Sequence, residues 1–137
     1  MWESLSFFSP RLIVVEFNPT ISNDIIFIQD NDPAINQGCS LAALIELGQS
    51  KSYKLIATTS WNAFFVKTEL FHKFKIEDNS INAMHDPAHF ESRLFQCYDG
   101  SLVLAGCKHL LWHDVSIAAE DIQVLPKSLR KFDGPAE

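Results

Sequence analysis

Residues 11–18 read RLIVVEFN, and this stretch decides the fold that the sequence predicts. Four apolar residues, Leu12 to Val15, follow one another without a polar interruption. Unbroken hydrophobicity over so short a run is typical of a strand that is buried on both faces, as strands are in a parallel sheet. The sequence therefore predicts an α/β fold with a central strand over 11–18.

The residues that follow predict the rest of the sheet. A polar insertion over 19–39 separates the first strand from a helix that Ser40 caps and that runs to about residue 50. Strands are then expected over 53–59 and 62–67. Only Ser60 and Trp61 lie between these two strands, so they are predicted to form an antiparallel pair. Thr68 is expected to cap a short helix.

The carboxyl-terminal part predicts a β-hairpin. Residues 76–91 read as a loop with a helical turn, and two strand-like runs, 94–98 and 101–105, flank Asp99-Gly100. This dipeptide is typical of a two-residue hairpin turn. We expect an α/β domain over 1–75 and an extension over 76–137, which contains the hairpin 94–105 and a short helix near the carboxyl terminus.

Composition excludes several classes of protein. The chain has 137 residues, of which 47% are hydrophobic and 20% charged, and its net charge is −6. A chain this acidic offers no basic face for nucleic acid or for an anionic membrane surface. No apolar run approaches the roughly 20 residues of a membrane helix. The first ten residues lack the basic start of a signal peptide, and three cysteines suit a reducing compartment, so a cytoplasmic location is expected.

Histidine pairs suggest a metal site, but their context argues against one. His85 and His89 are four residues apart, as are His109 and His113, yet neither pair has the adjacent Glu of the HExxH motif. The histidines are therefore interpreted as solvated or locally hydrogen-bonded. The acidic loop around Asp30 lacks the glycine and glutamate of an EF-hand, and no metal ligand is predicted.

The common catalytic and nucleotide-binding motifs are also missing. The three cysteines form no CxxC pair, and no G-x-S-x-G surrounds a serine. The five glycines include no pair two residues apart, so there is no G-x-G turn for a nucleotide.

Glu16 and Asn18 are the candidate catalytic residues. They stand at the carboxyl end of the first strand, and ligands of open parallel sheets bind beyond the carboxyl ends of the strands. Each residue also has a structural interpretation, which stays open: Glu16 pairs with a nearby basic group, and Asn18 starts a turn before Pro19.

Two segments of the sequence resemble a known family of proteins. SPRLIVVEFNPT (9–20), followed after the insertion by SLAALIELGQSKSYKLIATTSWNAFFVKTELF (40–71), resembles the carboxyl-terminal half of FkbM-type methyltransferases, which use S-adenosylmethionine. The resemblance implies that residues 1–75 are the carboxyl-terminal half of a methyltransferase-like domain. They would form a partial Rossmann-like sheet that holds the family's strands five, seven and six, with an antiparallel last strand. Glu16 matches the glutamate at the end of the family's fifth strand, and the choice of Asn18 rests on its position alone.

The resemblance also implies that these 137 residues lack the strands that bind the cofactor in the family. Family members hold S-adenosylmethionine through a glycine-rich turn and acidic and polar residues of the preceding strands, which would lie before Met1. No cofactor-binding residue is therefore assigned within these 137 residues.

Two hypotheses follow for the function. In the first, the chain is a methyltransferase fragment that is inactive unless a missing amino-terminal half is supplied. In the second, it is a non-catalytic interaction module that dimerises or binds a partner through its open sheet edge. Strand 11–18 would then associate with a second copy or with the missing half.

Overall fold

The computed structural model describes residues 2–5 and 7–132 as a mixed α/β protein with small antiparallel sheets and few helices. Contacts within the chain divide it into two units, Met1–Pro87 and Ala88–Glu137. No helix among the described residues is long and apolar enough to cross a bilayer.

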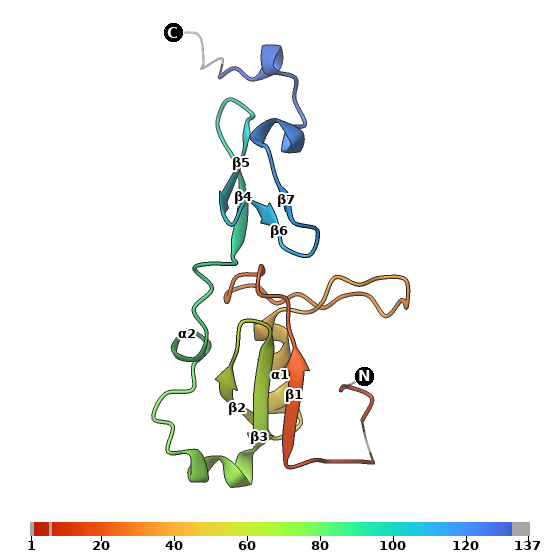
Figure 1. Ribbon diagram of the computed structural model, residues 1–137, viewed down its shortest axis with the longest axis vertical. Coiled ribbons are helices and arrows are strands. Elements are labelled where there is room, and N and C mark those ends of the chain that lie inside the picture. Colours follow the sequence, from red (N-terminus) through yellow and green to blue (C-terminus); the bar gives the residue numbers. More distant parts are fainter. Residues whose placement is uncertain (1, 6, 133–137) are drawn as a thin grey trace. The chain divides into compact units, whose positions relative to one another are not determined.

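The first unit is built on a three-stranded sheet (Figure 1). Strands β1 (Leu12–Glu16), β2 (Tyr53–Thr58) and β3 (Asn62–Lys67) lie in the order β1-β3-β2. Both pairings are antiparallel, so β1 and β2 run in the same direction on either side of the reversed β3. The predicted antiparallel pair of β2 and β3 is confirmed, whereas β1 has no parallel neighbour among the described strands.

The prediction that β1 is buried on both faces is wrong. Along β1 the side chains alternate between half-buried and exposed, and the strand spans 12–16 rather than 11–18. The unbroken apolar run is misleading because one face of β1 is left exposed in the described structure. Apolar side chains on that face remain accessible.

Helix α1 (Leu41–Ser50) covers the inner face of the sheet (Figure 1). As predicted, Ser40 caps the helix, and its hydroxyl accepts a hydrogen bond from the amide of Ala43 at 3.2 Å. Phe65 of β3 is fully buried at the centre of the core and packs against the ring of Trp2, with 4.9 Å between ring centroids. The other buried core residues are Phe17, Leu41, Leu44, Tyr53, Leu55 and Ala63.

The insertion over 19–39 forms no helix or strand in the described structure, and backbone hydrogen bonds tie it to the start of α1. Phe27 donates to the Ser40 hydroxyl, and the Ser40 amide donates to the Phe27 carbonyl, both at 2.9 Å. The side chain of Gln29 accepts hydrogen bonds from the amides of Gln37 and Gly38. The two arms of the loop are thereby held together.

After β3 the chain turns through a 3₁₀ helix at Thr68–Phe74 and the short helix α2 (Ile81–Met84). Thr68 lies inside the 3₁₀ helix, and no side chain caps it, so the predicted capping role of Thr68 is wrong. Ser80 caps α2. The Thr58 hydroxyl donates to the carbonyl of Met84, which fastens α2 to the end of β2.

The second unit contains the predicted hairpin. Strands β4 (Ser92–Gln96) and β5 (Leu102–Gly106) pair antiparallel, and a smaller hairpin joins β6 (His109–Leu110) to β7 (Val115–Ser116). Two 3₁₀ turns follow, at Ala119–Ile122 and Lys127–Leu129. The second of these turns is all that forms of the predicted carboxyl-terminal helix in the described residues.

The hairpin turn differs from the prediction by one residue. Gln96 lies opposite Leu102, and the Cys97 amide donates to the Ser101 carbonyl at 2.8 Å, which leaves a three-residue loop. Gly100 adopts a φ of 82°, and the Asp99 carboxylate accepts hydrogen bonds from the amide and hydroxyl of Ser101. A turn closed by a glycine bulge is the usual three-residue alternative to the two-residue turn. Cys97 therefore faces Ser101 and not Leu102.

Candidate functional site: an open sheet face and a free strand edge

The face of the sheet opposite α1 is apolar and only partly covered: Val66 is 3% exposed, whereas the residues of β1 on this face are open. Residues directly opposite in an antiparallel pair point to the same face, so Val14 and Phe64 share this face, as do Leu12 and Val66. Leu12 and Val14 are 49% and 51% exposed. Apolar side chains that are accessible side by side in this way mark a surface suited to binding.

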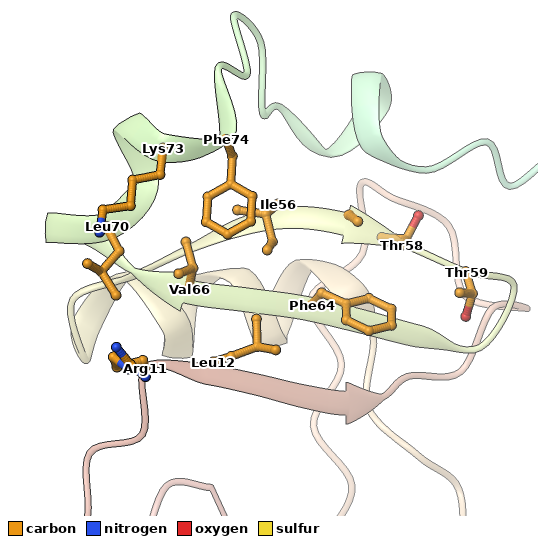
Figure 2. A pocket seen from close by; sticks show the side chains of 11 residues that line it. Arg11, Leu12, Ile56, Thr58, Thr59, Phe64, Val66, Leu70, Lys73 and Phe74 are labelled. Atoms are coloured by element: carbon orange, nitrogen blue, oxygen red, sulfur yellow. The ribbon is translucent and has the colours of Figure 1, made fainter.

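A groove of about 510 Å³ lies on this open face (Figure 2). The sheet supplies its floor, and the 3₁₀ helix supplies one wall through Leu70 and Phe74. Arg11 and Lys73 lie toward the Leu70 end, whereas Thr58 and Thr59 lie toward the other end (Figure 2). The groove is therefore an apolar surface with positive charge at one end. Its remaining lining residues are Leu12, Ile56, Ala57, Phe64 and Val66.

Strand β1 has a free edge beside this face. The Lys67 amide donates to the Arg11 carbonyl at 3.1 Å, and the Phe17 amide donates to the Trp61 carbonyl at 2.8 Å. These bonds show that the odd-numbered residues of this stretch direct their backbone groups toward β3. Because the direction alternates along a strand, residues 12, 14 and 16 direct theirs away from β3. No other strand of the described structure pairs with that edge.

Glu16 lies at the carboxyl end of β1, opposite Asn62 and on the open face. Its side chain is exposed. Within the described part of the chain, no hydrogen bond or ion pair holds its carboxylate, so the predicted pairing with a basic group is not formed inside the unit. The carboxylate is accessible to a binding partner.

Asn18 has a structural role. Its amide nitrogen donates to the Gln37 carbonyl at 2.9 Å, and its amide oxygen accepts from the amide and hydroxyl of Thr20, at 3.0 and 2.7 Å. Asn18 thus starts a turn at Pro19, as its structural interpretation predicts. Both polar groups of the Asn18 side chain are engaged in holding the base of the insertion.

His85 is a buried residue that the sequence does not reveal. Its ring meets the ring of Phe17 edge-on, with centroids 5.0 Å apart, and its Nε2 has no hydrogen-bond partner within the described residues. Burial lowers the pKa of His85 below its ordinary value, and attraction to Asp86 opposes part of this effect. The interpretation of His85 as solvated or locally hydrogen-bonded is wrong, because the insertion and α2 close over the end of β1.

The remaining polar groups near His85 do not form a reaction centre. The Asn23 side chain donates to the carbonyl of His85 at 3.1 Å and to Asn82 at 3.0 Å. Glu16 lies on the opposite face of β1 from Phe17, the residue that contacts His85. An acid–base pair of Glu16 and His85 is therefore not assembled.

The other histidines and the cysteines add no further cluster. His109 is hydrogen-bonded to Asp114 at 3.1 Å, as the local interpretation predicts. The three cysteines are unpaired. Across residues 2–5 and 7–132, no three His, Cys, Asp or Glu side chains are grouped in a way that could hold a metal ion.

The first unit therefore offers a binding surface, which consists of the free edge of β1 and an apolar face. Arg11 and Lys73 lie at one end of this face, and Glu16 lies at the other end of β1. Such a surface can bind a polypeptide or an apolar ligand, but it brings no nucleophile or acid–base pair together. No protein-family model matches the chain, and neither the curated proteins nor the solved structures contain a significant match to it.

Proposed function

We propose that residues 1–87 form the carboxyl-terminal edge of a methyltransferase-like sheet, which another polypeptide segment completes and supplies with its cofactor site. The observation that carries this proposal is the free edge of β1 beside the exposed apolar side chains of Leu12 and Val14. A strand with unpaired backbone groups and exposed apolar side chains is stabilised when a further strand and a covering element are added.

The strand order supports the methyltransferase part of the proposal. The resemblance to FkbM-type methyltransferases implies that the reversed last strand lies between two strands of common direction. The order β1-β3-β2, with β3 antiparallel to both neighbours, agrees with that expectation. The position of α1, between β1 and β2 in the sequence, agrees as well.

The unit alone is proposed to be inactive. Neither this unit nor the rest of the 137-residue chain contains a G-x-G turn through which S-adenosylmethionine could be held. Of the two candidate catalytic residues, Asn18 is engaged in the insertion, and Glu16 is accessible but lacks an acid–base partner. In the completed sheet, Glu16 would stand at the substrate side.

The first experiment is to sequence the transcript upstream of the Met1 codon. We expect a reading frame that encodes an apolar strand followed by a glycine-rich turn. Co-expression of that product with this chain should then yield a complex that binds S-adenosylhomocysteine in calorimetry, whereas the chain alone should give no heat of binding. Binding by the chain alone would contradict the proposal, as would a co-expressed complex without affinity for the ligand.

A second candidate function is a non-catalytic interaction module. The free edge of β1 favours it independently of any methyltransferase chemistry, because an unpaired edge recruits strands by main-chain hydrogen bonds. This function predicts a defined assembly of the chain in solution, with no requirement for S-adenosylmethionine.

A further inference from the structure

We propose that β1 pairs with β1 of a second copy of the chain, so that two three-stranded sheets join into one of six strands. This proposal rests on the second candidate function, the interaction module, and identifies the partner as a second copy of the chain. Its starting point is the direction of the backbone groups of residues 12, 14 and 16, which face away from β3 and lack bonds to any described strand.

The geometry of the edge selects one antiparallel register. Only residues 12, 14 and 16 offer backbone groups, so each of them must lie opposite one of the same three residues of the second copy. The backbone groups of all three residues are paired only when Val14 lies opposite Val14 of the second copy and Leu12 lies opposite Glu16 of the second copy. The two copies are then related by a two-fold axis through Val14, as the isologous interface of a symmetric dimer requires.

Charge complementarity favours the same register. Arg11 and Glu16 are both exposed, and Arg11 lines the groove on the face toward which Glu16 points. In this register Arg11 of one copy lies opposite Phe17 of the other, one residue from Glu16, and the groove that Arg11 lines is on the face toward which that Glu16 points. Because the dimer is symmetric, the pair of Arg11 with Glu16 of the other copy occurs twice. A shifted register with Glu16 opposite itself would bring two carboxylates together.

The proposed register also places the open faces of the two sheets on the same side of the joined sheet. Even-numbered residues of β1 point to the open face, and in this register they lie opposite even-numbered residues. The inner faces, each covered by its own α1, therefore lie on one side of the joined sheet. The exposed Leu12 and Val14 side chains of both copies form one continuous apolar strip on the other side.

The proposal is tested by disulfide trapping in the full chain. In Val14→Cys, the two new thiols would face each other across the axis with their Cα atoms about 5.5 Å apart, which a disulfide spans. The matched control is Leu12→Cys, on the same strand, on the same face and almost equally exposed. The Cα atoms of its two cysteines would be about 14 Å apart, so the thiols should not link.

Mild oxidation followed by non-reducing electrophoresis gives the readout, with the wild-type chain setting the background from its three native cysteines. We expect a linked dimer for Val14→Cys and only background for Leu12→Cys. An equimolar mixture of Leu12→Cys and Glu16→Cys should yield the mixed disulfide. Equal linking of Val14→Cys and Leu12→Cys would overturn the register.

Sedimentation velocity tests the charge pair without a new thiol. We expect the wild-type chain to dimerise with rising concentration. Arg11→Glu should abolish the dimer, and the exchange Arg11→Glu with Glu16→Arg should restore it. Circular dichroism verifies the fold of each variant. A wild-type chain that stays monomeric, or an exchange that fails to restore the dimer, would overturn the proposal and leave the calorimetric test of the methyltransferase function unaffected.

Discussion

Phe64 and Phe65 are neighbours in the sequence but occupy different environments. Phe65 is fully buried between α1 and Trp2, whereas Phe64 lines the open groove on the opposite face. Phe65→Ala is expected to lower the free energy of unfolding by about 3–5 kcal/mol, because it leaves a cavity in the core. Phe64→Ala should cost less than about 2 kcal/mol, because its side chain is only partly removed from water.

Urea unfolding of both variants at a concentration where the chain is monomeric measures this difference. If Phe64→Ala costs as much as Phe65→Ala, the face that carries Phe64 is covered in solution. Such a result would contradict the open face on which the proposed function depends.

His85 makes the stability of the first unit dependent on pH. Burial lowers its pKa from an ordinary value of 6.5. The unfolded chain therefore binds the proton more tightly than the folded chain. The stability that neutral His85 contributes is complete above about pH 6.5 and is lost as the pH falls through the lower folded-state pKa.

Urea unfolding between about pH 7.5 and 5 tests this linkage. The wild-type chain should lose stability over this range, and His85→Leu should lose less. His72→Leu changes an exposed histidine and should keep the wild-type pH dependence. Identical slopes for the wild-type chain and His85→Leu would show that His85 is not buried as described.

At the scale of elements, α1 depends on the hydroxyl of Ser40. This buried oxygen accepts hydrogen bonds from Ala43 in the first turn of the helix and from Phe27 in the insertion. Ser40→Ala should cost about 1–3 kcal/mol, because it removes the cap and leaves a buried amide without a partner. Ser50→Ala, at the exposed end of the same helix, should cost less than about 0.5 kcal/mol.

Chemical denaturation monitored by far-ultraviolet circular dichroism compares these two serine variants. Equal stability of the two would contradict the double role of Ser40 at the junction of the insertion and α1.

The elements that the sequence predicts well are those governed by local chemistry. Ser40 followed by an apolar stripe indicates α1. Only three residues, 59–61, lie between β2 and β3, one more than predicted, and so short a connection permits only an antiparallel pair. The hairpin is predicted for the same reason, but its register is not. Asp99-Gly100 also fits a three-residue loop, and the hydrogen bonds that the amide and hydroxyl of Ser101 donate to the Asp99 carboxylate favour that alternative.

Features that depend on distant segments cannot be predicted in this way. The apolar run of β1 does not reveal that one face of the sheet stays open, because coverage is decided by what packs against it. Of the two candidate residues, Glu16 is exposed at the end of β1, and its predicted catalytic role stays a prediction, whereas the side chain of Asn18 is hydrogen-bonded to the insertion. The burial of His85 depends on contacts with Phe17, which lies 68 positions earlier in the numbering of the sequence.

At the scale of the whole molecule, the two units differ in their cores. Every member of the hydrophobic core cluster lies within residues 2–84. In the second unit, no residue of the described range 88–132 is buried. Short hairpins without a covered apolar face are marginally stable in water, and small domains with little buried surface rarely fold alone.

Separate expression of the two units tests this asymmetry. Residues 1–87 should unfold cooperatively on heating, with a midpoint close to that of the full chain, because they contain the core. Residues 88–137 should show no cooperative transition. Differential scanning calorimetry of both pieces and of the full chain gives the comparison. A large fall in the midpoint of residues 1–87, reversed when residues 88–137 are added back, would instead show that the hairpins stabilise the first unit by binding to it.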